Sequence, residues 1–319
     1  MVGGTAYAQR YSLWLEGQDA GRLHSAEGGE PYGEVVAVTY PAPDKTIQKH
    51  ISAVHYADIA LTCSAVPPAP LMGWISGMLE GFAPVHAGAV VAEQQPYAKR
   101  ARLEFTNAVI RQIELPALNA VARQPVYMTV RVAPGFTQRV TGPQPSSAGG
   151  VSAPLYGSDF TLKIPGLDCT HVAEIGPLVV RQTTDGLDVA DLVVTLPEGE
   201  DWYVWRDDLL GATHLGYASP FRKTGTLEYT SRRDVQARID FTGLGIHSLV
   251  VEPATASATH STPSMRVSMF CESLRYTVVP PATGDASAHL VGASAGAIPS
   301  RVEAIAPLGA RLARPIAPG

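Results

Sequence analysis

Alternation of apolar and polar residues predicts that the chain is built mostly of β-strands. Residues 11–17 run from an aromatic residue through apolar residues at every second position to a glycine, and residues 160–166 repeat this order. A period of two is typical of a strand with one buried face. The two segments therefore predict the opening strands of two similar domains.

Three further blocks recur in the same order and support a duplication. Residues 57–62 match residues 190–195, and residues 102–106 match residues 238–242. A last strand is predicted at residues 127–132 in the first copy and at residues 265–272 in the second. Blocks repeated in one order indicate a repeated structural unit.

Each copy contains one predicted helix. It lies between residues 57–62 and 102–106 in the first copy, and between residues 190–195 and 238–242 in the second. Apolar residues recur at helical spacing between Pro70 and Gly81, and again between Asp201 and Gly211. Proline suits the first turn, aspartate can cap the start, and glycine favours the end. The predicted apolar faces consist of Leu71, Trp74, Ile75, Met78 and Leu79 in the first copy and of Trp202, Trp205 and Leu209 in the second. The fold class predicted is mainly β, with two tandem barrel or sandwich domains of about six strands and one flanking α-helix each.

The copies differ in length at one place. Gly17 and Asp58 are 41 positions apart, whereas their counterparts Gly166 and Asp191 are 25 apart. We place the extra residues around positions 40–50, where two prolines and several charged side chains predict a projecting hairpin.

Composition marks the domain boundaries. We predict a first domain at residues 1–135, a Gly/Pro/Ser-rich linker at residues 136–157 and a second domain at residues 158–279. A Pro/Ala/Gly-rich tail follows at residues 280–319, and its scattered apolar residues predict that it docks on neighbouring subunits.

Charge and cysteine content narrow the class of protein. Charged residues make up 17 % of the 319 residues and the net charge is -5, which argues against a sequence-specific nucleic-acid reader. Cys63, Cys169 and Cys271 lie far apart, so buried free thiols are expected rather than a zinc site or disulfides. No apolar run approaches a membrane span, and the N-terminus does not resemble a secretory leader, so we expect synthesis in the cytoplasm and no membrane partner.

Motifs of catalytic chemistry are not found in the sequence. It contains no nucleophile elbow, zinc-protease helix, P-loop or dinucleotide-binding glycine motif. His50 and His55 are five residues apart, and surface positions are favoured over a metal pair. We therefore predict a protein that is not an enzyme and that uses no cofactor or metal.

Charged residues that recur in both copies are the candidate site residues. An acid precedes one buried strand of each copy, and a basic and an acidic residue share one face of another strand. We predict that the acids accept backbone N–H bonds or pair with basic side chains, and that the others form charge ladders or subunit contacts. An acid/base pair and a ligand-binding strip are the alternatives. These residues are Asp58, Arg102 and Glu104 in the first copy and Asp191, Arg238 and Asp240 in the second.

Spaced motifs over roughly residues 8–278 resemble the T4-type phage tail-tube protein family. The first copy carries residues 11–17, Lys49-His50-Ile51, residues 56–62, the helix with Trp74, and residues 102–110. The second copy, with residues 160–166, 202–205, 225–229 and 241–246, is similar to the second domain of two-domain phage tail proteins. The resemblance implies a barrel with a flanking helix, whose copies join edge to edge into rings that stack as a tube.

Two domains per chain would make three chains a pseudo-sixfold ring. In the family the long loop reaches the next ring, so the resemblance implies that the first copy carries the stacking contact and that the second gives it up. The implied partners are other copies of the chain as homotrimeric rings, with sheath, baseplate or terminator proteins beside them in a virion tail or phage-tail-like particle. The implied inter-ring residues are Tyr40, Pro43, Asp44, Lys45, Lys49 and His50.

Two alternatives stay open. Unequal loops also suit a tube-end adaptor or terminator that forms a ring without polymerising. A carbohydrate-binding β-sandwich would use exposed aromatic residues, for which the sequence offers Tyr7, Tyr32, Tyr97 and Tyr217.

Overall fold

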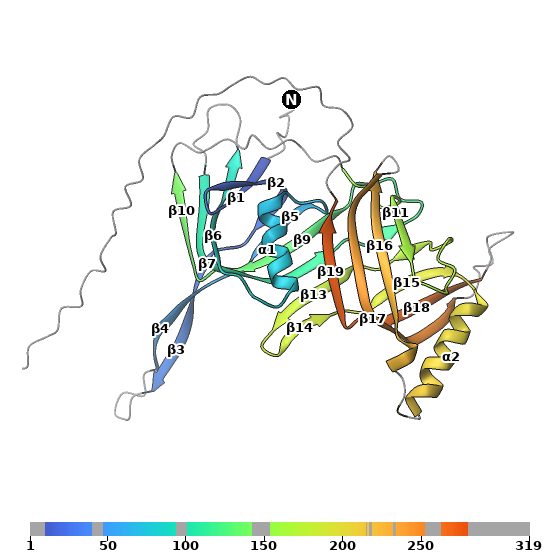
Figure 1. Cartoon of the computed structure of the whole chain (residues 1–319). Helices are drawn as coiled ribbons and strands as arrows, with labels where there is room; N and C mark the ends of the chain where they lie inside the picture. Colours follow the sequence, from blue (N-terminus) through green and yellow to red (C-terminus); the bar gives the residue numbers. More distant parts are fainter. Residues whose placement is uncertain are drawn as a thin grey trace, which may run out of the picture. The chain divides into compact units, whose positions relative to one another are not determined.

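The computed structural model describes residues 10–39, 47–93, 101–141, 154–214, 216, 219–231, 234–252 and 263–279. This part of the chain is mainly β, with two α-helices and two barrel-like sheets, which confirms the predicted fold class (Figure 1). Residues Met1–Pro281 form one compact unit.

The first half closes a six-stranded barrel. Each strand pairs antiparallel with the next, from β1 through β2, β5, β9, β7 and β6 back to β1. The bounds are β1 Arg10–Leu15, β2 Gln18–Glu27, β5 Ile59–Ser64, β6 His86–Glu93, β7 Ala101–Leu115 and β9 Tyr127–Ala133. Inward-facing residues of these strands fill the barrel, which is why the sequence alternates.

The second half repeats this order in a sheet that stays open between β11 and β12. Its strands run β11, β16, β17, β18, β15, β12. The bounds are β11 Phe160–Lys163, β12 Glu174–Ile175, β15 Leu192–Pro197, β16 Lys223–Ser231, β17 Asp234–Glu252 and β18 Ser264–Phe270. Element for element, the halves correspond, so the repeat in the sequence is a repeat in the fold.

Each half also carries a hairpin between its second and third barrel strands. In the first half β3 (Pro31–Thr39) and β4 (Ile47–Tyr56) form a separate two-stranded sheet. In the second half the hairpin of β13 (Leu178–Thr183) and β14 (Gly186–Val189) is shorter. The difference in length predicted from the sequence is therefore located in this hairpin.

The two helices use their tryptophans in parallel ways. In α1 (Ala69–Leu79) the Trp74 indole donates to the carbonyl oxygen of Pro84 at 2.9 Å, and in α2 (Glu200–His214) the Trp205 indole donates to that of Phe221 at 2.8 Å. Both rings are buried, as predicted, while Leu79 is only partly buried. The equivalent bonds make Trp74 and Trp205 counterparts.

The second helix differs from its prediction at both ends. It continues past Gly211 to His214, and the Thr213 hydroxyl donates to the Leu209 carbonyl oxygen within the added turn. Asp201 lies inside the first turn, and its carboxylate accepts the backbone N–H of Asp168 at 2.6 Å. A glycine with no positive φ does not stop a helix.

Strand β10 (Phe136–Thr141) occupies the first six residues of the segment predicted as a linker. It runs along β7 from the Phe136↔Thr106 pair to the Thr141↔Ala101 pair, as β19 (Ser273–Val278) runs along β17 in the second half. The rest of the segment up to residue 153 and the tail at 280–319 lie outside the described residues.

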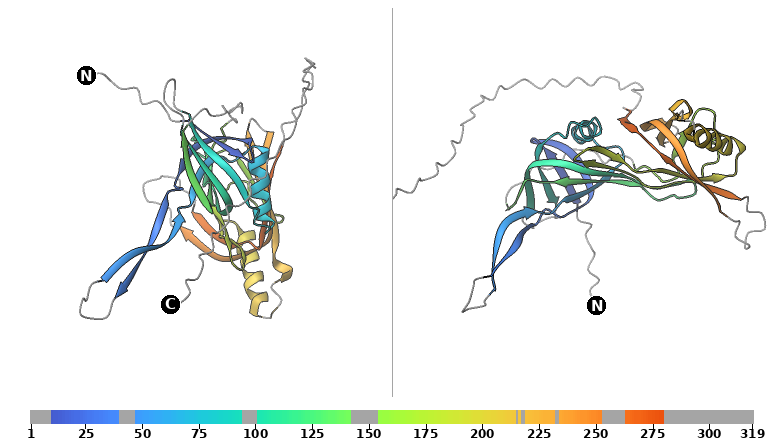
Figure 2. Two further views of the ribbon diagram at one scale, coloured as in Figure 1. Left: turned by 90° about the vertical axis from the view of Figure 1, so that its left-hand side faces the viewer. Right: turned by 90° about the horizontal axis from the view of Figure 1, so that it is seen from below.

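The halves exchange strands, so neither sheet belongs to one half alone (Figure 2). Strand β13 of the second half pairs antiparallel with β7 of the first, and β8 (Leu118–Asn119) of the first half pairs with β12 of the second. Main-chain hydrogen bonds thus connect the two cores in both directions, which predicts that they unfold together.

Two buried thiols, one in each core, can report on this coupling. Cys63 lies in the first half, where burial raises its pKa to about 12, and Cys271 lies in the second, where burial also raises its pKa. Both are free, as predicted, whereas Cys169 is only half-buried. A thiol reagent reacts with the thiolate, so neither buried thiol should react before unfolding.

We expect Leu178→Ala, on β13, to lower the free energy of unfolding of both halves by about 2–5 kcal/mol, because Leu178 is 3 % exposed and its loss leaves a cavity at the joint. The measurement is the labelling of Cys63 and Cys271 by a thiol reagent across a urea titration, in a Cys169→Ser background. Both midpoints should shift together. A shift of the Cys271 midpoint alone would show that the halves unfold independently.

Candidate assembly interface

The joint between the halves is a strand pair with apolar side chains on one face. Residues Leu178 to Arg181 of β13 pair with Leu115 to Gln112 of β7. Leu178, Val180, Ile113 and Leu115 are all buried. Arg181 Nε adds a 3.3 Å hydrogen bond to Gln112 Oε1. This pairing covers the side of β7 that β6 leaves open beyond Ala108.

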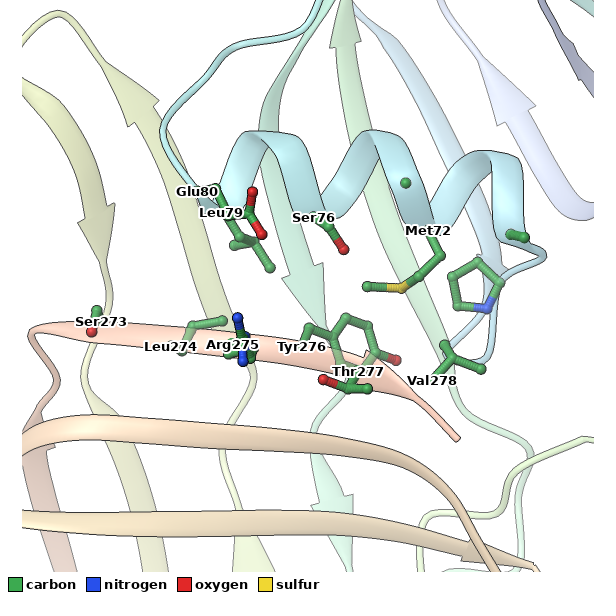
Figure 3. Close-up of a pocket in the computed structure, with 13 residues that line it drawn as sticks. Met72, Ser76, Leu79, Glu80, Ser273, Leu274, Arg275, Tyr276, Thr277 and Val278 are labelled. Atoms are coloured by element: carbon green, nitrogen blue, oxygen red, sulfur yellow. The ribbon is translucent and has the colours of Figure 1, made fainter. Parts of the chain in front are cut away.

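A second contact of the same joint lies between α1 and β19. The Tyr276 hydroxyl on β19 donates to the carbonyl oxygen of Ala65, just before α1, and both residues are buried. A groove of about 700 Å³ runs between the two elements, with Met72, Ser76 and Leu79 on its helix side (Figure 3). Burial raises the pKa of Tyr276 well above its ordinary value.

The joint uses different surfaces of the two halves. The first half contributes the edge of β7 and the face of α1, while the second contributes the β13 hairpin and β19. A contact between unlike surfaces of two similar domains is heterologous, and such a contact can be repeated from domain to domain.

A ladder of charged side chains, which includes the predicted site residue Arg238, crosses neighbouring strands of the second half. The carboxylate of Glu228 on β16 accepts hydrogen bonds from Lys163 Nζ on β11 at 2.7 Å and from Arg238 on β17 at 2.6 Å. The Glu228 side chain is 7 % exposed. The hydrogen bonds from Lys163 and Arg238 lower the pKa of Glu228.

Asp240 lies on the next rung of this ladder. Its carboxylate accepts a 3.0 Å hydrogen bond from the Thr226 hydroxyl, and Arg275 is the residue opposite it in the register of β17 with β19. Arg238 and Asp240 therefore each contact a side chain of β16, and their predicted roles as charge ladder and subunit contacts stay predictions.

In the first half the corresponding residues pair along the strand. Arg102 and Glu104 form an ion pair with each other on β7, and their neighbours on β10 are Val140 and Gln138. The second half therefore carries a cross-strand ladder at positions where the first carries a single pair.

The repeated acid has different surroundings in the two halves. Asp191 Oδ2 lies 2.8 Å from His247 Nε2, and both side chains are 44 % exposed. For Asp58 no hydrogen bond or ion pair is found among the described residues. Asp191 thus contacts a histidine side chain, and the roles predicted for the two acids stay predictions.

The predicted stacking residues fall on or beside the β3–β4 hairpin. Tyr40, Pro43, Asp44 and Lys45 lie outside the described residues. Lys49 and His50 are exposed on β4. The hairpin also exposes apolar side chains, each more than half exposed, at Tyr32, Val35, Ile47, Ile51 and Val54.

In the described part of the chain, no group of three or more His, Cys, Asp or Glu side chains could hold a metal ion. His55 lies 3.6 Å from Glu34 across the hairpin. Of the aromatic residues considered for sugar binding, Tyr32 is exposed, whereas Tyr7, Tyr97 and Tyr217 lie outside the described residues. Neither described helix is long and apolar enough to cross a membrane.

Sequence reasoning missed Lys163, Glu228 and the joint itself. Glu228 gave a local signal, since an acid within the apolar run of residues 227–229 on a predicted strand needs a partner. Lys163 is 65 positions away, and no periodicity connects it to Glu228.

No family model matches the chain, and no curated protein matches it. Among solved structures, a chain in the six-fold symmetrised cryo-EM structure of the anti-feeding prophage baseplate is similar to part of it. The match has 11 % sequence identity and a TM-score of 0.34, and it covers 44 % of this chain and 97 % of the other.

We expect Glu228→Gln to lower the free energy of unfolding at pH 7 by about 1–3 kcal/mol, because two charge-assisted hydrogen bonds weaken. The lowered pKa means that the carboxylate stabilises the fold above its unfolded pKa of about 4.3, and that this contribution is lost as the pH falls through the lower folded pKa. Urea unfolding at pH 7 and at pH 3 measures the loss of stability in Glu228→Gln and its dependence on pH.

The difference between wild type and Glu228→Gln should therefore shrink in acid. Glu27→Gln, at an exposed position on β2, is the matched control and should leave the free energy of unfolding unchanged. An effect of Glu228→Gln that is equal at both pH values would contradict a role for the carboxylate charge.

Proposed function

We propose that the protein is a structural, self-assembling component whose chains join into closed rings, as part of the tube or a tube-like conduit of a phage or phage-derived contractile particle. Its role is mechanical, and the chain acts neither as an enzyme nor as a cofactor carrier. The resemblance of its spaced motifs to tail-tube proteins led to this hypothesis, and the joint between its halves supports it.

The observation that carries the proposal is the heterologous strand pairing of two similar domains within one chain. Each domain contains the elements that build either side of this joint: a long barrel strand, a helix, a hairpin and a last strand. If the joint repeats between chains with a constant rotation, the domains form a ring or a helix. Three chains supply six domains to a pseudo-sixfold ring.

The charged ladder also fits this role. Lys163 and Arg238 both donate to Glu228 within the chain, and Asp240 lies beside Arg238, so these two basic and two acidic side chains balance in charge. A conduit wall benefits from hydrophilic, paired groups, because isolated charges of one sign would hold a charged cargo in place.

We expect the purified protein to form particles of three chains that appear as rings with pseudo-sixfold symmetry. Sedimentation velocity gives the mass, and negative-stain microscopy shows the symmetry and whether rings stack. A protein that stays monomeric at its highest soluble concentration would contradict the proposal.

The stacked tube and the unstacked adaptor differ in what the hairpin tip does. We expect deletion of residues 43–48 to convert stacked tubes into isolated rings, because the tip is proposed to reach the next ring. Microscopy of matched samples measures the length distribution. Val121→Lys, at an exposed residue outside the hairpin, is the control and should retain the stacks. If the wild type forms single rings that the deletion does not alter, the adaptor role is favoured.

A further inference from the structure

The free end of β17 marks a place where a strand is missing. Residues 245–252 pair with β18 on one side, whereas β16 on the other side ends at the Lys223↔Leu244 pair. Beyond Leu244, the described part of the chain supplies no strand to that side. Val250 and Val251 there are 56 % and 43 % exposed.

The first half shows what fills the corresponding place. Arg102 on β7 and Arg238 on β17 occupy equivalent positions. The same separation relates Val109, where β7 begins to pair with β9, to Gly245, where β17 begins to pair with β18. Residues 112–115 of β7 therefore correspond to residues 248–251 of β17. In β7 these residues pair with β13, and Leu115 is 2 % exposed. The edge that is covered in β7 is thus open in β17.

The missing strand has a matching unpaired segment in the same chain. The β3–β4 hairpin corresponds to the β13–β14 hairpin, since each lies between the second and third barrel strands of its half. Yet β3–β4 pairs with no other described strand. The hairpin and the far end of β17 extend from different ends of the unit (Figure 2).

Helix α2 independently indicates that a partner is missing on this side of the second half. Because Trp205 corresponds to Trp74, Leu210 corresponds to Leu79, which faces the groove against β19. Leu210 is 42 % exposed, and Val204 on the same helix is 52 % exposed. On the first half, β10 is the counterpart of β19, and it exposes Phe136.

We propose that the partner of these surfaces is a second copy of this chain, and that β3 of one copy adds to the open edge of β17 in the next, as β13 adds to β7 within the chain. In the same contact, β10 of the one copy faces α2 of the next. The inference rests on the proposed self-assembly and names the surfaces that carry it.

Complementary variants test the inference. The donor variant is Val35→Lys with Ile51→Lys, a cross-strand pair of exposed residues on the hairpin. The acceptor variant is Val250→Lys with Val251→Lys. Lysines at apolar contact positions should weaken association at least roughly thirtyfold, the scale of an interface hot spot. All four positions are exposed, so each chain should fold, and unchanged labelling of Cys63 and Cys271 checks this.

The decisive sample is the equimolar mixture. Each variant alone should sediment as a monomer, whereas the mixture should form a two-chain complex and stop there, because the donor variant keeps an intact acceptor edge and the acceptor variant keeps an intact hairpin. Val121→Lys, at an exposed residue outside both surfaces, is the control and should assemble as the wild type does.

The other outcomes separate the two proposals. If the wild type and both variants assemble alike, the self-assembly stands and the inference about β3 and β17 is overturned. If both variants are monomeric and their mixture is too, the inference is likewise overturned. A wild type that never assembles contradicts the proposed function, and the inference falls with it.

Discussion

The pairing of β13 with β7 is the interaction on which the rest of the structure depends. It places a hairpin of the second half on a strand of the first and buries Leu178 and Val180 against Ile113 and Leu115. Main-chain hydrogen bonds along this edge hold the two halves in register, so two barrels that share one sequence plan act as one compact unit. By contrast, the last residues of β17 have a strand partner on one side only among the described residues.

The inequality of the two hairpins follows from this arrangement. The β13–β14 hairpin has its receiving strand in the same chain and is short, with Leu178 and Val180 buried on that strand. The β3–β4 hairpin has no receiving strand among the described residues and keeps apolar side chains in solvent, where they cost free energy unless a partner covers them. A pair of strands that stands alone is also only marginally stable in water. Both facts favour a partner for β3–β4.

The sequence predicted the local elements well and the long-range contacts poorly. Alternation identified the opening strands, and helical spacing identified the buried faces around Trp74 and Trp205, because both signals arise from nearby residues. Strand β12, only two residues long, is too short for any periodicity. The joint and the Lys163–Glu228 contact link residues more than 60 positions apart, and a strand's sequence does not name its partner. Strand β10 was not predicted, because Gly135 before it and the Gly/Pro-rich residues after it resemble the boundaries of a linker.

The covalent connection of the two halves in one chain would lower the entropic cost of the proposed assembly. Six separate domains must form six contacts between free molecules to close a ring, whereas three chains of this kind already contain half of those contacts. Each association event loses translational and rotational freedom, so a chain that carries one joint internally loses less on closing. The internal joint also fixes the geometry that the external one must match, because a ring closes only if both joints turn successive domains through compatible angles. The shorter hairpin is the one that pairs within the chain, and the longer hairpin is the one proposed to reach another molecule.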